Sequence, residues 1–371
     1  MKWKLGLVGA ALLTIGGVAH AQSSVTIYGL MDLFVGRMGT LPGANSATRP
    51  VQVLNGGGLS TSYLGFRGRE DLGDGAYAAF ELSTFIRADT GALGRSDALG
   101  PPTNLGGDGF FSRTSWVGIG HARYGSLRFG NVTTLMFINS LSANAFGAST
   151  TFSPMNLVMF VGGPLSGGTA WNNQIVYDSP SLGGLSFSVA GALPEGQGKR
   201  NLGAAVFYRT GDLYAGLAWQ DVKKTPLTFA DGTSFSQTKS WLLSGTYDFK
   251  WAKVHANLGA IKDGGLLAAP ADRDHRLWSL SVSIPVGAGQ ILAGYASRKT
   301  GDVVPPVPPT APGGNFSRRV ASVGYDYFFS KRTDVYAIAM NDHTVTTTLP
   351  APPRNVSASA TSFGIGLRHA F

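Results

Sequence analysis

Residues that could support catalysis or bind a metal are few and widely separated in this chain. After residue 21 the histidines are His121, His255, His275, His343 and His369, and none belongs to an H-E-x-x-H motif or another i, i+4 pair. The chain has no cysteine, which excludes thiolate catalysis and disulfides, and it has no G-x-S-x-G elbow. We therefore predict no cofactor, no metal site and no enzyme. A hydrolase that assembles its catalytic set from residues distant in the sequence is the alternative.

Electrostatic attraction of dissolved ions is a second kind of chemistry, and three arginines suggest it. Arg67, Arg113 and Arg128 stand in short stretches where apolar and small residues alternate. A guanidinium is always charged, so several on one face would attract anions. Whether they share a face depends on the strands that carry them.

Alternation over about ten residues recurs along the chain and predicts strands. In the stretch 278–284, Trp278, Leu280, Val282 and Ile284 alternate with serines. The second face of these stretches is mostly Ser, Gly, Ala and Asn rather than charge. That pattern is typical of a barrel with lipid outside and a hydrated lumen inside. The chain contains 52 glycines, which also suits many-stranded β structure.

Sixteen strands are predicted, with fourteen or eighteen as the alternatives, and long and short connections join them alternately. The predicted ranges are 24–36, 60–68, 75–87, 112–121, 124–131, 171–178, 184–192, 201–209, 211–221, 240–250, 252–262, 274–284, 288–298, 317–328, 332–342 and 360–371. Strict alternation puts all long loops on one rim, as in outer-membrane barrels. An even number lets the first and last strands pair, so no edge is left in lipid.

The third long connection, residues 132–170, is the most unusual stretch. It belongs to a run from Phe129 to Tyr177 that contains no Asp, Glu, Lys, Arg or His. Its many Phe, Met and Leu residues argue against disorder, and its prolines and glycines against a membrane helix. We expect it to fold inside the barrel.

The N-terminal residues predict export. Lys2 and Lys4 precede an apolar run that ends in Ala19-His20-Ala21, so residues 1–21 read as a cleaved signal peptide and 22–371 as a single barrel domain. The formal net charge of +9 includes these two lysines. The basic residues are scattered along the chain and form no long cluster, which does not favour a nucleic-acid partner.

Several stretches together resemble the general trimeric porins of Gram-negative outer membranes. They are SSVTIYGLMD (23–32), LGFRGREDLGDG (64–75), SRTSWVGIG (112–120), YGSLRFGN (124–131), NNQIVYDSPSLGGLSFS (172–188) and GIGLRHAF (364–371). The resemblance implies a homotrimer of sixteen-stranded barrels, each with its third loop folded into the pore. It also implies lipid and lipopolysaccharide as surroundings, and an assembly signal at Phe371 read by the outer-membrane assembly machinery.

In such porins, wall arginines oppose acids on the third loop, and this chain departs from that pattern. Tyr63, Asn131 and Val176 stand where such porins often carry arginine, and the third loop has no acid. The resemblance therefore implies a weak or one-sided transverse field in this pore.

Strand parity predicts which side chains face the lumen. An arginine facing lipid at mid-depth costs about 2–4 kcal/mol, so inward placement is favoured. For 112–121 we take Thr114 and Trp116 as lipid-facing. The predicted pore-lining residues are then Tyr63, Arg67, Arg113, Arg128, Asp32, Glu81 and Arg368.

These observations predict an all-β, sixteen-stranded antiparallel transmembrane barrel that passes small hydrophilic solutes and ions through a water-filled, anion-preferring pore. An alternative is a channel for aromatic or amphipathic solutes. Such solutes would bind an apolar patch on the constriction loop. The other interpretation of the patch is that its side chains only pack the loop against the wall. A third class is an adhesin whose pore is incidental. The patch residues are Phe137, Phe146, Phe152, Met155, Met159 and Phe160.

Overall fold

The computed structural model describes residues 24–39, 50–94, 109–160, 166–195, 199–223, 227–228, 234–265, 273–300, 314–348 and 354–371. The expected signal peptide, residues 1–21, lies outside the described residues. Within the described part, no helix is both long and apolar enough to cross a membrane.

In the described residues, nineteen strands form one sheet, and three of them, β2, β5 and β12, are short additions. The bounds are β1 (Ser24–Met38), β2 (Val51–Gly56), β3 (Tyr63–Gly73), β4 (Ala76–Arg87), β5 (Ala92–Leu93), β6 (Thr114–His121), β7 (Gly125–Thr133), β8 (Ala170–Asp178), β9 (Leu185–Ala192), β10 (Asn201–Thr210), β11 (Leu213–Val222), β12 (Leu227–Thr228), β13 (Ser234–Asp248), β14 (Lys253–Gly265), β15 (Arg273–Val286), β16 (Gly289–Thr300), β17 (Gly314–Phe328), β18 (Thr333–Thr348) and β19 (Arg354–Ala370).

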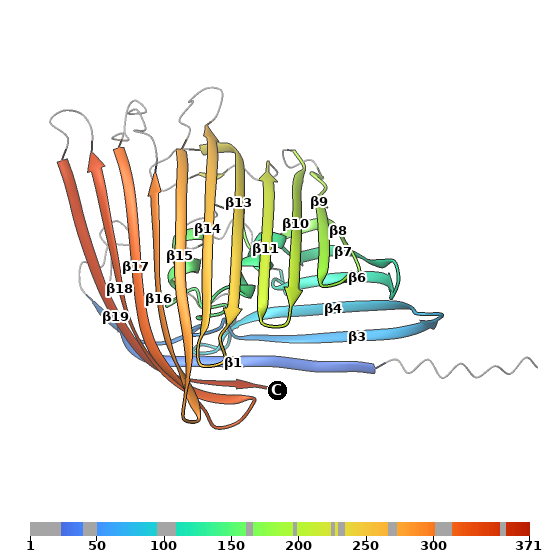
Figure 1. The fold of residues 1–371 in the computed structure, drawn as a ribbon, viewed down its shortest axis with the longest axis horizontal. Coiled ribbons are helices and arrows are strands. Elements are labelled where there is room, and N and C mark those ends of the chain that lie inside the picture. Colours follow the sequence, from blue (N-terminus) through green and yellow to red (C-terminus); the bar gives the residue numbers. More distant parts are fainter. Residues whose placement is uncertain are drawn as a thin grey trace, which may run out of the picture.

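The other sixteen strands close into an antiparallel barrel, which confirms the predicted fold class (Figure 1). The first half of β1 pairs with β3, and its second half pairs with β19 in a register that joins Leu30 to Ala370. Closure gives each of these sixteen strands a neighbour on both sides, as a membrane-spanning sheet requires.

Several strands extend beyond their predicted ends at the long-loop rim. β13, β18 and β19 all continue into segments that we predicted as loops. There the outer face is polar, as in Asn355, Ser357, Ser359 and Thr361 of β19, so apolar alternation stops while backbone pairing continues. β2 likewise lies inside the first predicted loop, paired with β1. Strand pairing extends beyond the apolar alternation because water, rather than lipid, surrounds the strands there.

Tight turns gather at one rim of the barrel and long connections at the other, as predicted (Figure 1). Two of the turns, β3–β4 and β10–β11, place Gly75 (φ 83°) and Gly211 (φ 49°) in the left-handed region that glycine adopts without strain. In outer-membrane barrels such short turns face the periplasm.

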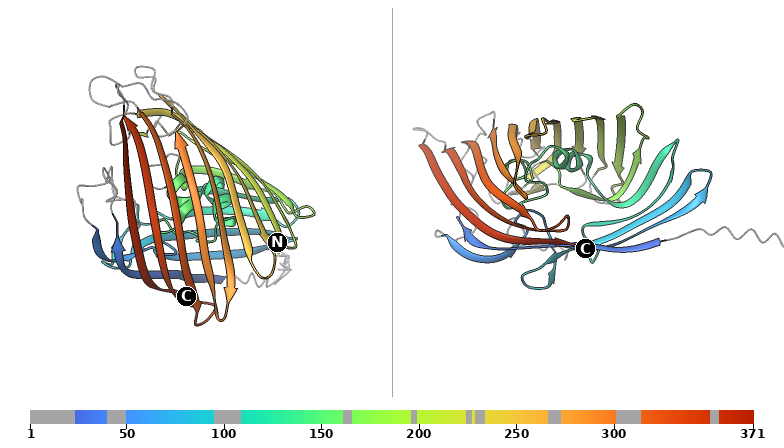
Figure 2. Two further views of the ribbon diagram at one scale, coloured as in Figure 1. Left: turned by 60° about the vertical axis from the view of Figure 1, so that its left-hand side comes forward. Right: turned by 60° about the horizontal axis from the view of Figure 1, so that its bottom comes forward.

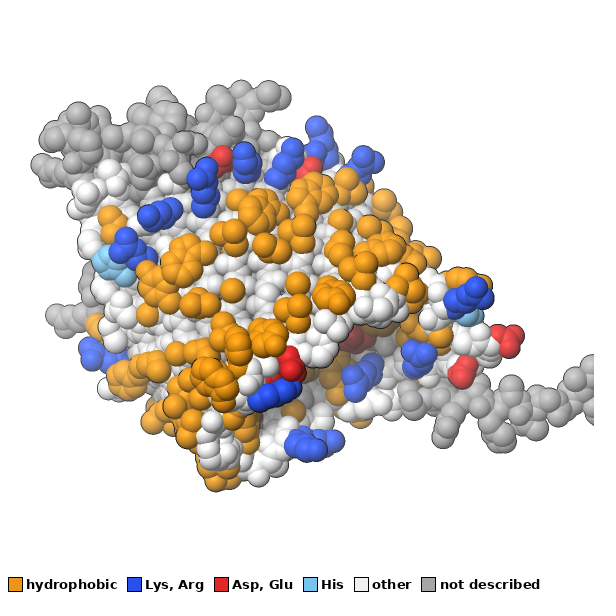
Figure 3. Space-filling view, viewed as in Figure 1, with side chains coloured by type: hydrophobic (Ala, Val, Ile, Leu, Met, Phe, Trp, Pro, Cys, Tyr) orange, Lys and Arg blue, Asp and Glu red, His pale blue; other side chains and the backbone are white. Residues whose placement is uncertain are grey.

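The outer face of the barrel is apolar and rich in aromatic residues (Figure 3). Trp241, Trp278 and Tyr295 lie on this face toward the long-loop rim, and Trp278 and Tyr295 are in ring contact at 5.3 Å. Toward the short-turn rim, Tyr247 and Phe249 are in contact at 4.6 Å. Aromatic belts at both interfaces are typical of a barrel that spans a bilayer.

The interior is occupied by the third long connection, which carries α1 (Leu135–Ser142) and α2 (Pro154–Met159). Each helix begins at a hydroxyl residue that caps it. Thr134 Oγ1 accepts from Phe137 N, and Ser153 Oγ accepts from Asn156 N, with Pro154 in the first turn. The larger of two clusters of buried apolar residues in the described part of the chain lies between this loop and the barrel wall.

The chain end is tied to the first strand. The backbones of Gly29 and Phe371 exchange two hydrogen bonds of 3.1 Å. The Phe371 ring lies over Gly29, where a Cβ would sit 2.4 Å from the ring and 2.8 Å from the carbonyl oxygen of Tyr63. Only glycine allows this approach, an instance of an aromatic ring covering a strand glycine.

Gly29→Ala is therefore expected to lower the free energy of unfolding by about 1–3 kcal/mol, because the new methyl group overpacks the Phe371 site. Urea unfolding in detergent, followed by tryptophan fluorescence, measures the change. Gly191→Ala is the matched control, since a Cβ there meets its nearest atom at 3.8 Å. Equal stability of the two variants would contradict this account of the chain end.

Candidate pore and constriction loop

The third loop lies inside the barrel along the wall made by the later strands. α1 contacts β10, β11 and β13, and α2 contacts β15, β16 and β17. Figure 2 shows both helices within the space that the curved sheet encloses. The expected constriction loop is therefore in place.

Hydrogen bonds hold α1 against the wall. Asn139 Nδ2 donates to the carbonyl oxygen of Leu242 at 2.8 Å, and its Oδ1 accepts from the Tyr214 hydroxyl at 2.7 Å. Just after the helix, Asn257 Nδ2 donates to the carbonyl oxygen of Ala143 at 2.7 Å. Asn139 is fully buried. The amide side chains thus act as fixed attachments rather than as groups that face the pore.

Two arginines of the wall hold the end of α2. Arg298 donates to the carbonyl oxygen of Val158 at 2.8 Å, and Arg318 donates to that of Leu157 at 2.7 Å. Carbonyls in the last turn of a helix lack intrahelical partners and carry partial negative charge, so cations are favoured there. Arg318 also forms a two-pronged pair with Asp342, with a shortest distance of 2.6 Å. These two arginines therefore hold the loop in place rather than face the solute path.

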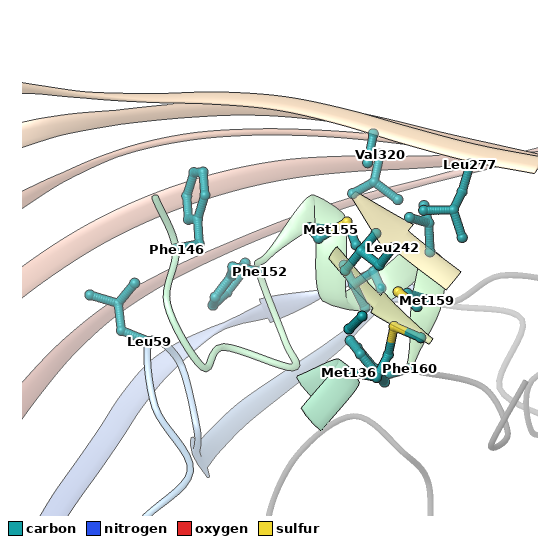
Figure 4. Close-up of a cluster of buried hydrophobic side chains, with 14 of the residues drawn as sticks. Leu59, Met136, Phe146, Phe152, Met155, Met159, Phe160, Leu242, Leu277 and Val320 are labelled. Carbon is teal, nitrogen blue, oxygen red and sulfur yellow. The ribbon is translucent and has the colours of Figure 1, made fainter. Parts of the chain in front are cut away.

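The apolar side chains of the loop pack against the barrel, as Figure 4 shows for most of them. Phe152 contacts Phe34 of β1 in an edge-to-face pair at 5.4 Å. Phe137 is half-buried and contacts Phe160 at 5.1 Å. The buried members of the predicted patch are Phe146, Phe152, Met155, Met159 and Phe160. This burial favours the packing alternative over an apolar patch that meets solutes.

Opposite the loop, arginines and tyrosines of the first strands share the lumen face. The Arg113 guanidinium lies over the Tyr63 ring at 4.0 Å and contacts Glu81 at 3.4 Å. The Arg67 guanidinium lies over the Tyr28 ring at 5.0 Å. Tyr28 in turn donates its hydroxyl proton to Glu81. The β4 acid Glu81 is thus shared by a group from β1 and groups at the start of β6.

Our parity assignment for residues 112–121 was wrong. Trp116 stands opposite Glu81 in register, and Thr114 Oγ1 donates to Glu81 Oε1 at 3.0 Å, so both face the lumen. Val117 and Ile119 are the exposed, outward residues of β6. Arg113 precedes the strand, and its long side chain still reaches the lumen. The sequence Thr-Ser-Trp-Val alternates too weakly to fix the face, because a tryptophan suits either side.

Arg128 faces the lumen but is neutralised. It donates from Nε at 3.0 Å and from Nη2 at 2.8 Å to one oxygen of Asp178. Arg128 lies three residues after Gly125, where β7 begins at the short β6–β7 turn. Its guanidinium also lies 5.6 Å from the Trp116 ring centre. A pair of this kind leaves little net field in the pore.

The remaining predicted charges belong to buried networks. Arg368 contacts Asp334 at 3.1 Å and Asp326 at 3.6 Å. Asp32 is fully buried and accepts hydrogen bonds from the backbone N–H groups of Leu59 and Ser60 and from the hydroxyl group of Tyr336. Both residues fix β1, β18 and β19 to the first loop.

Sequence reasoning missed Arg209 on β10. Arg209 lies on the lumen face, since it shares parity with Ala205, which pairs with Ser188. Its guanidinium lies over the Tyr214 ring at 4.5 Å and donates to Ser142 Oγ, at the end of α1, at 3.0 Å. Alternation in the strand 201–209 puts Phe207 and Arg209 on the same face. The register with the neighbouring strands is needed to show that this face is the lumen face.

No group of three or more His, Cys, Asp or Glu residues in the described part of the chain is arranged to hold a metal ion. Phe371 projects outward and is about half exposed.

Removing the attachment of α1 should loosen the loop. Asn139→Ala leaves the buried Tyr214 hydroxyl without its acceptor, which costs about 1–3 kcal/mol. Single-channel recordings are expected to show larger current fluctuations, because the constriction moves. Asn341→Ala removes an amide on the outer face that bonds Ser359 and Thr361, and should leave the current unchanged. Identical noise in both variants would contradict the role assigned to Asn139.

Comparisons with known proteins place this geometry in context. A family model described as Gram-negative porin matches residues 9–347. The chain is 28% identical to outer membrane porin protein 32 of Delftia acidovorans, over 99% of this chain and all of that protein. A solved structure described as an anion-selective porin from Comamonas acidovorans matches with a TM-score of 0.73 at 24% identity, over 94% of this chain and 100% of that one. The trimer form of the Vibrio cholerae outer membrane protein OmpT matches with a TM-score of 0.65 at 16% identity, over 94% of this chain and 99% of that one.

Proposed function

The chain belongs to the Gram-negative porin family of the outer membrane, and from this premise we propose that its barrel is a passive diffusion channel that prefers anions. Small hydrophilic solutes and ions would cross between the third loop and the wall of β1, β3, β4 and β6. No bond is made or broken in this process, so the proposal requires no catalytic residue.

The observation that carries the anion preference is the imbalance among exposed lumen charges. Arg67 and Arg209 are exposed, and no carboxylate of the described residues lies within 4.0 Å of either guanidinium. The described part of the third loop contributes no acid to oppose them. A fixed positive charge beside a water-filled path raises the local concentration of anions and lowers that of cations.

The other lumen charges change this balance little. Arg128 is matched by Asp178 and Arg318 by Asp342. Arg368 contacts two aspartates, which leaves one carboxylate in excess, but Asp326 and Asp334 retain only 2% and 9% side-chain exposure. Asp32 is fully buried and closed off by its hydrogen bonds. Glu81 retains 24% side-chain exposure and is the acid that most directly opposes the arginines. A neighbour of the same fold is described as anion-selective, which is in line with this balance.

Arg67→Gln and Arg209→Gln should each shift the reversal potential in a salt gradient toward cations. A unit charge about 6 Å from an ion in water is worth roughly 0.7 kcal/mol, or about a threefold change in ion occupancy. Glu81→Gln should shift it the opposite way, because the amide keeps an acceptor for Tyr28 but loses the charge.

Arg123→Gln, in the β6–β7 turn, is the charge-matched control and should leave selectivity unchanged. Cation preference in the wild type, or shifts of the same size in the Arg123 variant, would overturn the proposal.

We also propose that three copies associate through the wall made by β6 to β9. These strands have 8 or 9 residues, against 15 to 17 in β17 to β19. Eight residues rise about 26 Å along the strand, and roughly 20 Å across the membrane at the usual tilt. That is less than a bilayer core of about 30 Å. A neighbouring barrel would cover this low wall better than lipid. The OmpT structure that matches this chain is described as a trimer form.

Native mass spectrometry in mild detergent should therefore give the mass of three chains. Val117→Arg, on the exposed outer face of β6, should release folded monomers, because a charge inside an apolar interface lacks a partner. Val323→Arg, on the outer face of β17, is the matched control and should keep the trimer. A monomeric wild type, or a trimer that survives Val117→Arg, would refute this interface.

A further inference from the structure

A row of cations crosses the outer face of the barrel at the long-loop rim, above the hydrophobic band (Figure 3). Each of five consecutive barrel strands, β13 to β17, contributes one exposed residue. They are Lys239, Lys262, Arg276, Lys299 and Arg319. We call this row the basic stripe. It has no part in the pore, because these side chains share parity with the outward-facing Trp241, Leu258, Trp278, Tyr295 and Val323.

The register makes the stripe continuous. Lys239 stands directly opposite Lys262, and Arg276 directly opposite Lys299. Arg319, on the next strand, stands opposite His343. Neighbouring strands are about 4.8 Å apart, so the five positions cover roughly 19 Å of the rim.

Few acids neutralise these cations. Among the described outer-face residues of β11 and β13 to β17 at this rim, the acids are Asp274, which stands opposite Lys262 and contacts it at 3.5 Å, and Asp221, which stands opposite Lys239 and contacts Lys223 at 3.1 Å. Arg276, Lys299 and Arg319 have no acid directly opposite them in the sheet. Like charges directly opposite in a sheet destabilise it, and the stripe contains two such pairs, one in the β13–β14 ladder and one in the β15–β16 ladder. An anionic partner at this surface would offset that cost.

The surroundings of the stripe indicate the chemistry of that partner. Trp241 and Trp278 each stand two residues from a stripe cation, on the membrane side. A groove of about 460 Å³ runs across β14 to β16. Its lining includes Leu258 and Trp278 on the apolar side and, at the charged end, Arg276, Lys299 and the carboxylate of Asp274, which contacts Lys262 at 3.5 Å. A site that is cationic at one end and apolar at the other fits a lipid better than a soluble anion or a nucleic acid.

We propose that the basic stripe binds the phosphorylated headgroup of an outer-leaflet lipid. The phosphate contacts Arg276 and Lys299, and an acyl chain lies along Leu258 and Trp278. The long-loop rim of an outer-membrane barrel faces outward, so the stripe lies at the level of the outer-leaflet headgroups. This interaction is independent of ion selectivity, because the stripe and the lumen lie on opposite faces of the sheet.

The test is native mass spectrometry of the detergent-solubilised protein with bisphosphorylated lipid A as the probe. Arg276→Gln/Lys299→Gln is expected to weaken binding about 30-fold, or about fivefold per cation. Lys262→Gln/Arg319→Gln probes the same stripe through a separate pair. Lys331→Gln/Arg332→Gln removes two exposed cations from the β17–β18 turn at the opposite rim and should bind like the wild type.

Three results would overturn the proposal. The first is equal affinity for lipid A whose phosphates have been removed. The second is unchanged binding by both stripe variants, once circular dichroism has shown that they are folded. The third is displacement of the lipid by an equal concentration of inorganic phosphate, which would indicate a simple anion site. The reversal potential of the Arg276→Gln/Lys299→Gln variant should match the wild type, which separates this test from that of the pore.

Discussion

The structure depends on one constraint, which is that every backbone N–H and C=O group within the lipid layer must find a partner in the protein. The pairing of β1 with β19 meets this constraint by leaving no edge. Closure then forces each strand to show one face to lipid and the other to water. The outward aromatic residues and the inward arginines are two consequences of the same geometry. The covering of Gly29 by Phe371 shows how closely the two ends of the chain fit where they meet.

Inside the barrel, the same need for partners decides what each charge does. Arg298 and Arg318 are occupied by the carbonyls at the end of α2, and Arg128 by Asp178. Charges that complete hydrogen bonds of the protein contribute to stability and contribute little to the field in the pore. The arginines left for solutes are those, such as Arg67 and Arg209, that lie over tyrosine rings instead of against acids. A ring orients the guanidinium without cancelling its charge.

Strand number and closure could be predicted from sequence because alternation and turn residues encode them locally. The position of the third loop inside the barrel follows from its uncharged, apolar composition and from the resemblance to porins. The face of Trp116 could not, since tryptophan is at home both in an aromatic belt and in a lumen wall, and only the register with Glu81 settles it. The pairing of Arg128 with Asp178 likewise joins residues 50 positions apart. The ends of β18 and β19 escaped prediction because paired backbone continues past the lipid, where side-chain pattern no longer reports it.

The route of the third loop also bears on the order of assembly. Its residues lie in the first half of the chain, yet its partners include Leu242, Ser281, Arg318 and Ser322 in the second half. The loop cannot reach its final seat until those strands have joined the sheet. The channel therefore narrows late in folding, and a partly assembled barrel is wider inside than the complete one. Its permeability barrier matures together with its last strands.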